Sequence, residues 1–288
     1  MAGSLLDRAL GIIELLAAEA HGLKLQDLAD RLTIPKSAAH RLLADLIRHG
    51  YVRQNSVGTY LLTTKVLSLG YSWLGGSGVA DMVQPTLDRL ALSTGELVRY
   101  AVVDGERLAW IAKAQGARFG LRVDPDQGME PILYCTATGH AWLATLREED
   151  AIRLVLAQGL GHLAEQGPNA PRSIDALQHQ LMQVRERGYA LVIDSSAVGT
   201  ASMAAPVRHP ITQRVVGILS IAGPSARLVQ ERMRQIAPDL LAAATELGIA
   251  SAESPLPPIT DQKPDVGRGS LVLGSGQRRS GGLLPTGT

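Results

Sequence analysis

The chain has 288 residues, a length that predicts about two domains. Hydrophobic residues account for 45% of it, an ordinary fraction for a globular protein with an extensive core. The 28 Lys and Arg residues nearly balance the 27 Asp and Glu residues, so the net charge is only +1. This balance excludes nucleic-acid binding through a global basic field, and any such binding would depend on a local patch of cations.

The cysteine count and the hydropathy of the sequence further limit the class of protein. The one cysteine, Cys135, excludes an intramolecular disulfide and a cysteine-cluster zinc site, and it fits a reducing compartment. Residues 1–20 lack a basic segment followed by a long apolar run, so we predict no secretory signal. No window of about 20 uninterrupted apolar residues occurs, which predicts no membrane span. We therefore expect a soluble cytoplasmic protein that needs no metal or cofactor.

The first expected helix starts after Ser4, which forms a plausible capping pair with Asp7. Its expected buried side consists of four apolar residues, Leu6, Leu10, Ile13 and Leu16. This side would pack against the two helices that follow.

Residues 25–48 contain two further helical patterns separated by a tight turn. The first buries residues at the 3–4 spacing of one helical face, namely Leu25, Leu28, Ala29 and Leu32. Pro35 fits the first turn of the second helix, where its missing N–H costs nothing. The second apolar stripe consists of Ala39, Leu42, Leu43, Leu46 and Ile47. Gly50 is expected to end this helix in the left-handed conformation.

A β-hairpin is predicted next, because residues 51–53 and 59–61 are β-prone runs around turn residues 55–58. Helix, turn, helix and hairpin in this order outline a winged helix-turn-helix over residues 1–63. The second helix of the pair carries cations and hydroxyl donors near its start, the end that a recognition helix places against bases in the major groove. The predicted DNA-binding residues are Lys36, Ser37, Ala38, His40, Arg41, Arg48 and Arg53.

An ordinary solvated face is the alternative for any one of these side chains. Residues 1–70 hold eight Lys and Arg against six Asp and Glu, which is a small excess. The prediction of DNA binding therefore depends on the position of the cations on one helix.

Residues 64–78 are expected to connect two domains, with a helix over residues 63–74 and a hinge at the glycine cluster 75–78. Residues 79–248 would form the second domain. Its first expected elements are a helix over 79–93, two strands at 97–103 and 107–113 around Asp104-Gly105, and a third strand at 119–123. The later ones are helices at 138–146, 149–157 and 173–187, strands at 189–193, 201–207 and 215–222, and a helix over 227–247.

Mixed helices and antiparallel strands predict an α+β domain with a single sheet. From Ser251 onward Pro, Gly, Ser and Arg dominate and apolar periodicity is lost. We expect residues 249–288 to form a disordered tail, to which no function is assigned.

Several segments together resemble the IclR family of bacterial transcriptional regulators over about residues 4–248. They are LADRLTIPKSAAHRLLADLIRHGYV, YCTATGHAWLA, ERGYALVIDSSAVGTASMAAPV and VVGILSIAGP. The resemblance implies a winged-helix domain, a linker helix and a C-terminal GAF-like effector domain. It also implies binding to operator DNA as a homodimer or a dimer of dimers, paired mainly through the N-terminal domains.

Three positions depart from the family pattern. Thr33 stands in the turn where the family commonly has Gly, so it either adopts a normal φ or carries strain. Asp194 is the single acid in a run that usually has several, and His140 replaces a common Lys. The last two lie near the family's effector pocket, so effector identity cannot be transferred.

By analogy with the family, the effector pocket lies between the sheet and the loop that leads into the helix at Thr138. Free N–H groups at a helix start attract an anion such as a carboxylate. The predicted effector-binding residues are Leu121, Met129, Tyr134, Cys135, Thr136, Ala137, Thr138, Gly139, Asp194, Ser202 and Ser220. Arg122 is a further candidate partner for a carboxylate, and Tyr134, Tyr100 and Trp110 are candidates to clamp a ring. Small packing residues and an inert buried thiol are the alternatives.

Catalysis is not predicted. His140, His162 and His179 lack metal-ligand spacing, and no HExxH, GxSxG or P-loop occurs. Two functions from different classes remain, beside a third possibility of DNA binding without any effector. One is a regulator that binds operator DNA and is modulated by a small organic or aromatic acid. The other is a small-molecule-binding oligomerisation module without specific DNA binding.

Overall fold

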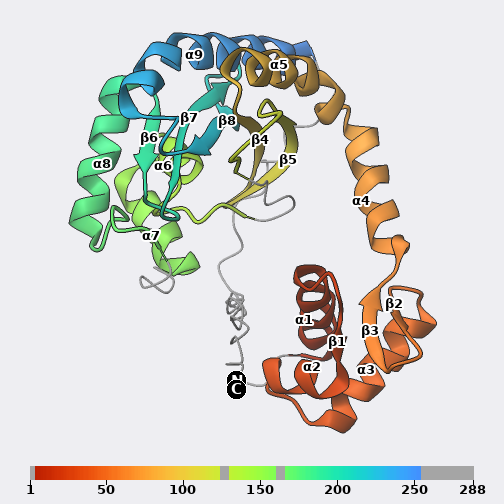
Figure 1. Cartoon of the computed structure of the whole chain (residues 1–288). Helices are drawn as coiled ribbons and strands as arrows, with labels where there is room; N and C mark the ends of the chain where they lie inside the picture. The colour runs from red at the N-terminus through yellow and green to blue at the C-terminus, as the bar shows by residue number, and fades with distance from the viewer. Residues whose placement is uncertain (1–3, 124–129, 160–165, 254–288) are drawn as a thin grey trace, which may run out of the picture. The chain divides into compact units, whose positions relative to one another are not determined.

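Figure 1 shows a computed structural model of the chain, which describes residues 4–123, 130–159 and 166–253. The described residues divide into two compact units, one that runs to Gly76 and one that begins at Ser77. The α+β class predicted from the sequence is confirmed, with helices and antiparallel strands in both units.

The first unit contains four helices and a small sheet of order β1-β3-β2. Its elements are α1 (Leu5–Ala18), β1 (Leu23–Lys24), α2 (Leu25–Arg31), α3 (Lys36–Arg48), β2 (Val52–Gln54), β3 (Thr59–Leu62) and α4 (Thr64–Ser77). The predicted capping pair is confirmed, because Ser4 N–H donates to Asp7 Oδ2 at 2.7 Å and Asp7 N–H donates to Ser4 Oγ at 3.1 Å. Strand β1 was missed, since two residues are too short to show a pattern.

The buried face of α1 differs from the prediction. Leu6 and Leu10 are 64% and 48% exposed and Ile13 is only half-buried, so of the four expected residues only Leu16 is buried. The helix instead buries Ile12, Leu15 and Leu16 in the core of this unit, where α1 contacts α3 and β3. This stripe also has 3–4 spacing, and α1 is apolar on so much of its circumference that periodicity alone could not select the face.

The turn between α2 and α3 contains strained backbone. Thr33 has φ +53°, the left-handed region that a β-branched residue rarely adopts. At the far end of α3, Gly50 has φ +76°, and Tyr51 N–H donates to Leu46 O at 2.9 Å. This Schellman arrangement confirms the predicted glycine cap. Ile47 is exposed and does not join the predicted apolar stripe.

The predicted hairpin is confirmed as β2 and β3, with Arg53 opposite Leu61. Asn55 shapes its turn, because its Oδ1 accepts from Val57 N–H at 3.2 Å and Thr59 N–H at 2.8 Å. After the hairpin, α4 runs through Gly75 and Gly76 to Ser77, so the predicted four-residue hinge is too wide. The left-handed residue is Gly78, with φ +65°.

The second unit is built on a five-stranded antiparallel sheet of order β5-β4-β8-β7-β6. Its strands are β4 (Leu97–Asp104), β5 (Arg107–Gln115), β6 (Ala190–Ile193), β7 (Thr200–Arg208) and β8 (Val215–Pro224). Its helices are α5 (Val79–Thr94), α6 (Ala137–Leu143), α7 (Glu148–Gln158), α8 (Ile174–Arg187) and α9 (Gln230–Glu253).

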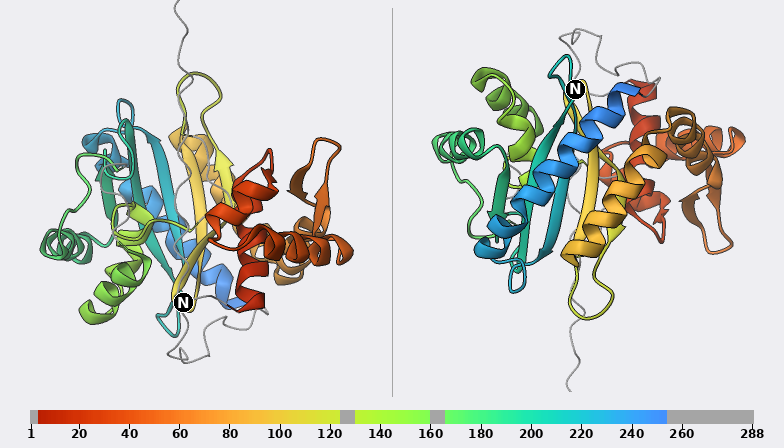
Figure 2. Two further views of the ribbon diagram at one scale, coloured as in Figure 1. Left: turned by 90° about the horizontal axis from the view of Figure 1, so that it is seen from below. Right: turned by 90° about the horizontal axis from the view of Figure 1, so that it is seen from above.

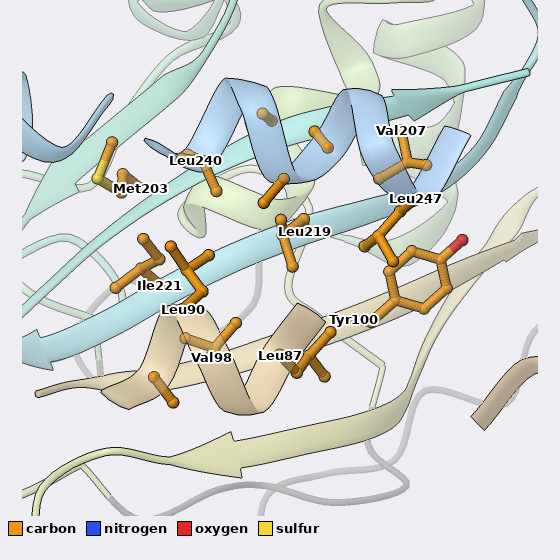
Figure 3. Packing of buried hydrophobic residues seen from close by; sticks show 14 of the residues in the cluster. Leu87, Leu90, Val98, Tyr100, Met203, Val207, Leu219, Ile221, Leu240 and Leu247 are labelled. Carbon is orange, nitrogen blue, oxygen red and sulfur yellow. The ribbon is translucent and has the colours of Figure 1, made fainter. Parts of the chain in front are cut away.

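Figure 2 shows α5 and α9 lying across one face of this sheet, with α7 and α8 on the other side. Figure 3 shows the core on the α5 and α9 face, where Leu87 and Leu240 meet Leu219 and Ile221 of β8. The second core lies on the α6 face and includes Trp110, Tyr134 and Cys135. The sheet therefore separates two environments, and strand alternation decides which one a side chain enters.

The predicted strand at 119–123 is wrong. These residues have no regular structure, and Phe119 and Leu121 are 91% and 70% exposed. Gly120 has φ +79°, a left-handed conformation that interrupts an extended run. Helix α9 ends six residues beyond the predicted end, at Glu253.

Candidate nucleic-acid interface and effector site

The first two turns of α3 form an exposed polar surface. Lys36, Ser37, His40 and Arg41 are all exposed, whereas Ala38 is half-buried beside the buried Ala39. Residues three and four apart share one face of a helix, so Ser37, His40 and Arg41 lie together there. The structure thus brings together four of the seven predicted DNA-binding residues in one stretch of helix.

The electrostatics of this helix start favour an anion. The first turn of α3 contains no acidic residue, and the N-cap Pro35 has no side chain that could bond the free N–H groups. A helix N-terminus carries a partial positive charge and unpaired N–H donors, which suit a phosphate. Lys36 adds a full positive charge at the same end.

Arg48 and Arg53 lie apart from this surface. Arg48 is in the last turn of α3, roughly 18 Å along the axis from Lys36 at 1.5 Å per residue. It also pairs with Asp45 at 2.8 Å. Arg53 is exposed on β2, in the hairpin. The residue that sequence reasoning missed here is structural: Lys65, whose Nζ donates to His49 O at 2.8 Å.

The start of α6 is closely packed. Thr136 is the N-cap, and its Oγ1 accepts from Gly139 N–H at 3.0 Å, so that N–H is not free for a ligand. A Cβ on Gly139 would lie 2.2 Å from Leu133 O, so only glycine fits. Ala137 and Thr138 are buried as well. The predicted cradle of free N–H groups is therefore partly used by the protein itself.

Ser202 and Ser220 are brought together on adjacent strands of the α6 face. Their strand neighbours Ala204 and Ile218 belong to the second core, and Ser220 lies opposite Ala204 in the β7–β8 register. Ser220 is buried and its Oγ donates to Arg99 O at 3.4 Å, whereas Ser202 is half-buried.

Tyr134 and Trp110 place polar atoms inside the same core. Among the described residues, neither Tyr134 Oη nor Trp110 Nε1 has a hydrogen-bond partner, although both side chains are more than nine-tenths buried. Burial raises the pKa of Tyr134 to about 12, so its hydroxyl keeps its proton. The Arg99 guanidinium lies 3.9 Å from the centre of the Trp110 ring, a contact that sequence reasoning missed.

Cys135 and His140 are both buried. Burial raises the pKa of the Cys135 thiol to about 12, and its Sγ donates to Gln166 Oε1 at 3.4 Å. Burial lowers the pKa of His140 to about 4, so the ring is neutral at pH 7. Its Nε2 lies 2.6 Å from Tyr134 O, and this nitrogen carries the proton because a carbonyl only accepts.

The remaining predicted effector residues are not gathered at one point. Asp194 has φ +50°, and its Oδ1 accepts from Gly199 N–H at 2.6 Å, so it holds a turn. Leu121 and Arg122 are exposed, and Met129 lies outside the described residues. Tyr100 packs on the α5 and α9 face, so it cannot clamp one ring together with Tyr134 and Trp110.

The described part of the chain lacks two further classes of site. Within residues 4–123, 130–159 and 166–253, no group of three or more His, Cys, Asp or Glu residues is placed to hold a metal ion. In the same ranges, no helix has the length and apolar character needed to cross a membrane.

Comparison with known proteins identifies the two units. The family described as "IclR helix-turn-helix domain" matches residues 5–56. The family described as "Bacterial transcriptional regulator IclR C-terminal" matches residues 72–249, which is more than half of the chain. The HTH-type transcriptional regulator BhcR of Paracoccus denitrificans is 29% identical over 248 residues, covering 86% of this chain and 87% of the relative.

Solved structures of IclR-type proteins are also similar to this chain. An IclR family transcriptional regulator from Brucella abortus is 26% identical, with a TM-score of 0.68 over 87% of this chain and 92% of that one. An IclR homolog from Microbacterium hydrocarbonoxydans, solved with 4-hydroxybenzoate, has a TM-score of 0.71 over 87% of this chain and all of that one. Its identity is 18%, so this likeness shows the fold alone. The chain belongs to the IclR family of bacterial transcriptional regulators.

Proposed function

We propose that the chain is a ligand-responsive regulator that binds operator DNA with α3 and the β2–β3 wing. The observation that carries this proposal is the group of Lys36, Ser37, His40 and Arg41, all exposed on the first two turns of a 13-residue helix. In this assignment residues 1–63 bind DNA, residues 64–78 form the connection and residues 79–248 bind the effector.

The residue types suit separate tasks at the DNA. Arg41 has the planar donor pair that reads guanine in the major groove, and Lys36 is a point charge for base or phosphate. Ser37 and the helix N–H groups contact phosphate, as does Arg53 on the wing. Arg48 must first leave Asp45 to do the same, so its contribution is the smallest.

The effector site lies on the α6 face of the sheet. Tyr134 Oη and Trp110 Nε1 are buried polar atoms whose desolvation would be offset by polar groups on a ligand. Ser202, Ser220, Cys135 and the residues at the start of α6 surround the same core. A small organic or aromatic acid fits this mixture of donors and apolar walls. The 4-hydroxybenzoate in the Microbacterium homolog makes that compound a suitable first probe.

Exposed apolar side chains support a homo-oligomer. In the first unit, Leu5, Leu6 and Leu10 on α1 and Leu67, Tyr71 and Trp73 on α4 are all exposed. Burying such side chains in a partner removes their apolar surface from water. A dimer or a dimer of dimers would read repeated half-sites on DNA. We infer a cytoplasmic location from this role.

Filter binding with sheared genomic DNA at several salt concentrations tests the proposal, followed by footprinting of the retained fragments. We expect binding that weakens as salt rises and a protected site of defined sequence. No binding at low salt would instead favour an oligomerisation module that binds small molecules only. A thermal-shift screen of organic and aromatic acids, including 4-hydroxybenzoate, tests the effector separately.

A further inference from the structure

Residues at the start of α4 are bonded to the residues that directly follow α3. Thr63 Oγ1 donates to Gly50 O at 2.5 Å, and Thr63 N–H donates to Tyr51 O at 2.9 Å. Lys65 Nζ donates to His49 O at 2.8 Å and lies 4.5 Å from the centre of the Tyr51 ring. Hydrogen bonds and a cation–π contact therefore join two helices that the wing separates in the sequence.

These contacts satisfy groups that a helix end leaves free. The last carbonyls of a helix have no partner within the helix, and that of the C-cap His49 accepts from Lys65. The carbonyl of Gly50, one residue past the cap, accepts from Thr63. Thr63 also caps α4, because its Oγ1 accepts from Lys65 N–H at 3.2 Å. One hydroxyl thus serves the end of α3 and the start of α4.

The position of Lys65 is explained by α3 and not by α4. A cation is favourable at a helix C-terminus and unfavourable at an N-terminus. Lys65 lies in the first turn of α4, where its charge opposes the helix dipole, but it reaches the C-terminal end of α3. Its ammonium therefore stabilises the junction between the helices at a cost to the isolated α4.

The backbone beyond the junction is continuous. No residue between Gly58 and Gly78 has a positive φ, and α4 is helical over Thr64–Ser77. Residues of α4 up to Gly76 belong to the same compact unit as α3. The first left-handed residue after the wing is Gly78, so the chain can change direction there without disturbing α4.

We propose that Thr63 and Lys65 are positioning residues that lock α3 and α4 into one rigid elbow. Any reorientation of α4 about Gly78 then turns the recognition helix by the same amount. A signal from the second unit reaches the DNA surface through this elbow. The statement about DNA rests on the proposed function, whereas the elbow itself does not.

Hydrogen exchange of the full-length chain, followed by mass spectrometry, tests the elbow without DNA or ligand. The variants are Thr63→Val, Lys65→Met and the conservative Lys65→Arg. Ser68→Ala is the matched control, because Ser68 Oγ donates to Thr64 O within α4 and does not contact α3. Losing one of the hydrogen bonds that Thr63 or Lys65 makes across the junction should accelerate exchange about five- to tenfold.

We expect this acceleration in the last turn of α3 and the first turn of α4 together, for both Thr63→Val and Lys65→Met. Lys65→Arg and Ser68→Ala should exchange like the wild type. Unchanged exchange in both variants would overturn the proposal, and so would acceleration confined to one of the two helices. Lys65 is exposed, so Lys65→Met remains informative if Thr63→Val fails to fold.

A second measurement separates positioning from direct DNA contact. Operator DNA is selected from a random pool with the wild type, and its affinity is then titrated at several salt concentrations. Lys65→Met should bind about fivefold more weakly, with the same slope of log K against log salt. A slope reduced by about one would mean that Lys65 contacts a phosphate, which overturns its role as a positioning residue. If the wild type selects no DNA, the proposed function fails, while the exchange result still decides the elbow.

Discussion

The start of α3 and the α6 face of the sheet carry their functional groups in opposite ways. Lys36, His40 and Arg41 are exposed to solvent, so their charged or hydrogen-bond-donating groups are accessible to a binding partner. Tyr134 and Trp110 are enclosed by apolar neighbours, and their polar atoms have no partner among the described residues. The proposed DNA-reading surface can thus be changed one side chain at a time, whereas a change in the proposed effector region also alters a packed core.

The largest expected effect is a loss of stability at Gly139, where the core leaves no space for a side chain. Gly139→Ala would place a methyl group 2.2 Å from Leu133 O, so the backbone must shift. We expect the free energy of unfolding of the second unit to fall by about 2–4 kcal/mol. Denaturant titration that follows the fluorescence of the buried Trp110 and Trp142 measures it. Gly70→Ala is the control, because no atom lies within 4 Å of a Cβ there; equal stability losses in both variants would contradict the packing account.

The next largest effect is expected on operator affinity, from a change on the exposed surface at the start of α3. Arg41→Ala should weaken operator binding by about 1–3 kcal/mol if its guanidinium reads a base, without changing stability. Arg48→Ala on the same helix should change affinity much less, because Arg48 is paired with Asp45. A gel-shift titration compares the two. If Arg48→Ala has the larger effect, the recognition surface lies at the other end of α3.

The buried face should also respond to pH. The pKa of His140 is lowered to about 4 in the folded chain, so between about pH 6.5 and pH 4 the unfolded state binds the additional proton. Stability is therefore complete above about pH 6.5 and falls by at most about 1.4 kcal/mol for each pH unit below it. Denaturation midpoints of the wild type and His140→Gln over pH 4–7 measure this dependence. Equal slopes in the two proteins would remove His140 as its cause.

The smallest expected effect concerns a single buried hydroxyl. Tyr134→Phe removes a polar atom that has no partner in the described part of the chain, so stability should be unchanged or rise by about 1 kcal/mol. Binding of the acid that gives the largest thermal shift should become weaker, as measured by calorimetry. Tyr100→Phe is the matched control, because Tyr100 packs on the opposite face of the sheet. If both variants bind the acid like the wild type, Tyr134 Oη does not contact it.

Local patterns predicted the first unit well. The α2–α3 pair, the Gly50 cap and the hairpin are confirmed, because each depends on neighbours within a few residues. The face of α1 could not be predicted, since two apolar stripes compete and only contact with α3 and β3 selects one. The glycine cluster suggested a hinge because isolated glycines weaken helices, yet Gly75 and Gly76 remain helical.

The effector region was less predictable because it depends on register and long-range packing. Tyr100 and Trp110 lie on opposite faces of the sheet, and an irregularity in the β4–β5 pairing next to Tyr100 shifts the alternation. The carboxylate of Asp194 is used by Gly199 N–H, five residues further on. Neither arrangement has a signal in residue types or spacing.

The affinity of the full-length chain for its selected operator, relative to unrelated DNA of the same length at the same salt, tests the central claim most directly. A regulator that reads sequence through the start of α3 should favour the operator by at least about a thousandfold. In Arg41→Ala this preference should fall by about 5- to 150-fold, the equivalent of about 1–3 kcal/mol. Equal affinities for the two DNAs would contradict the account, since phosphate contacts alone cannot distinguish sequences.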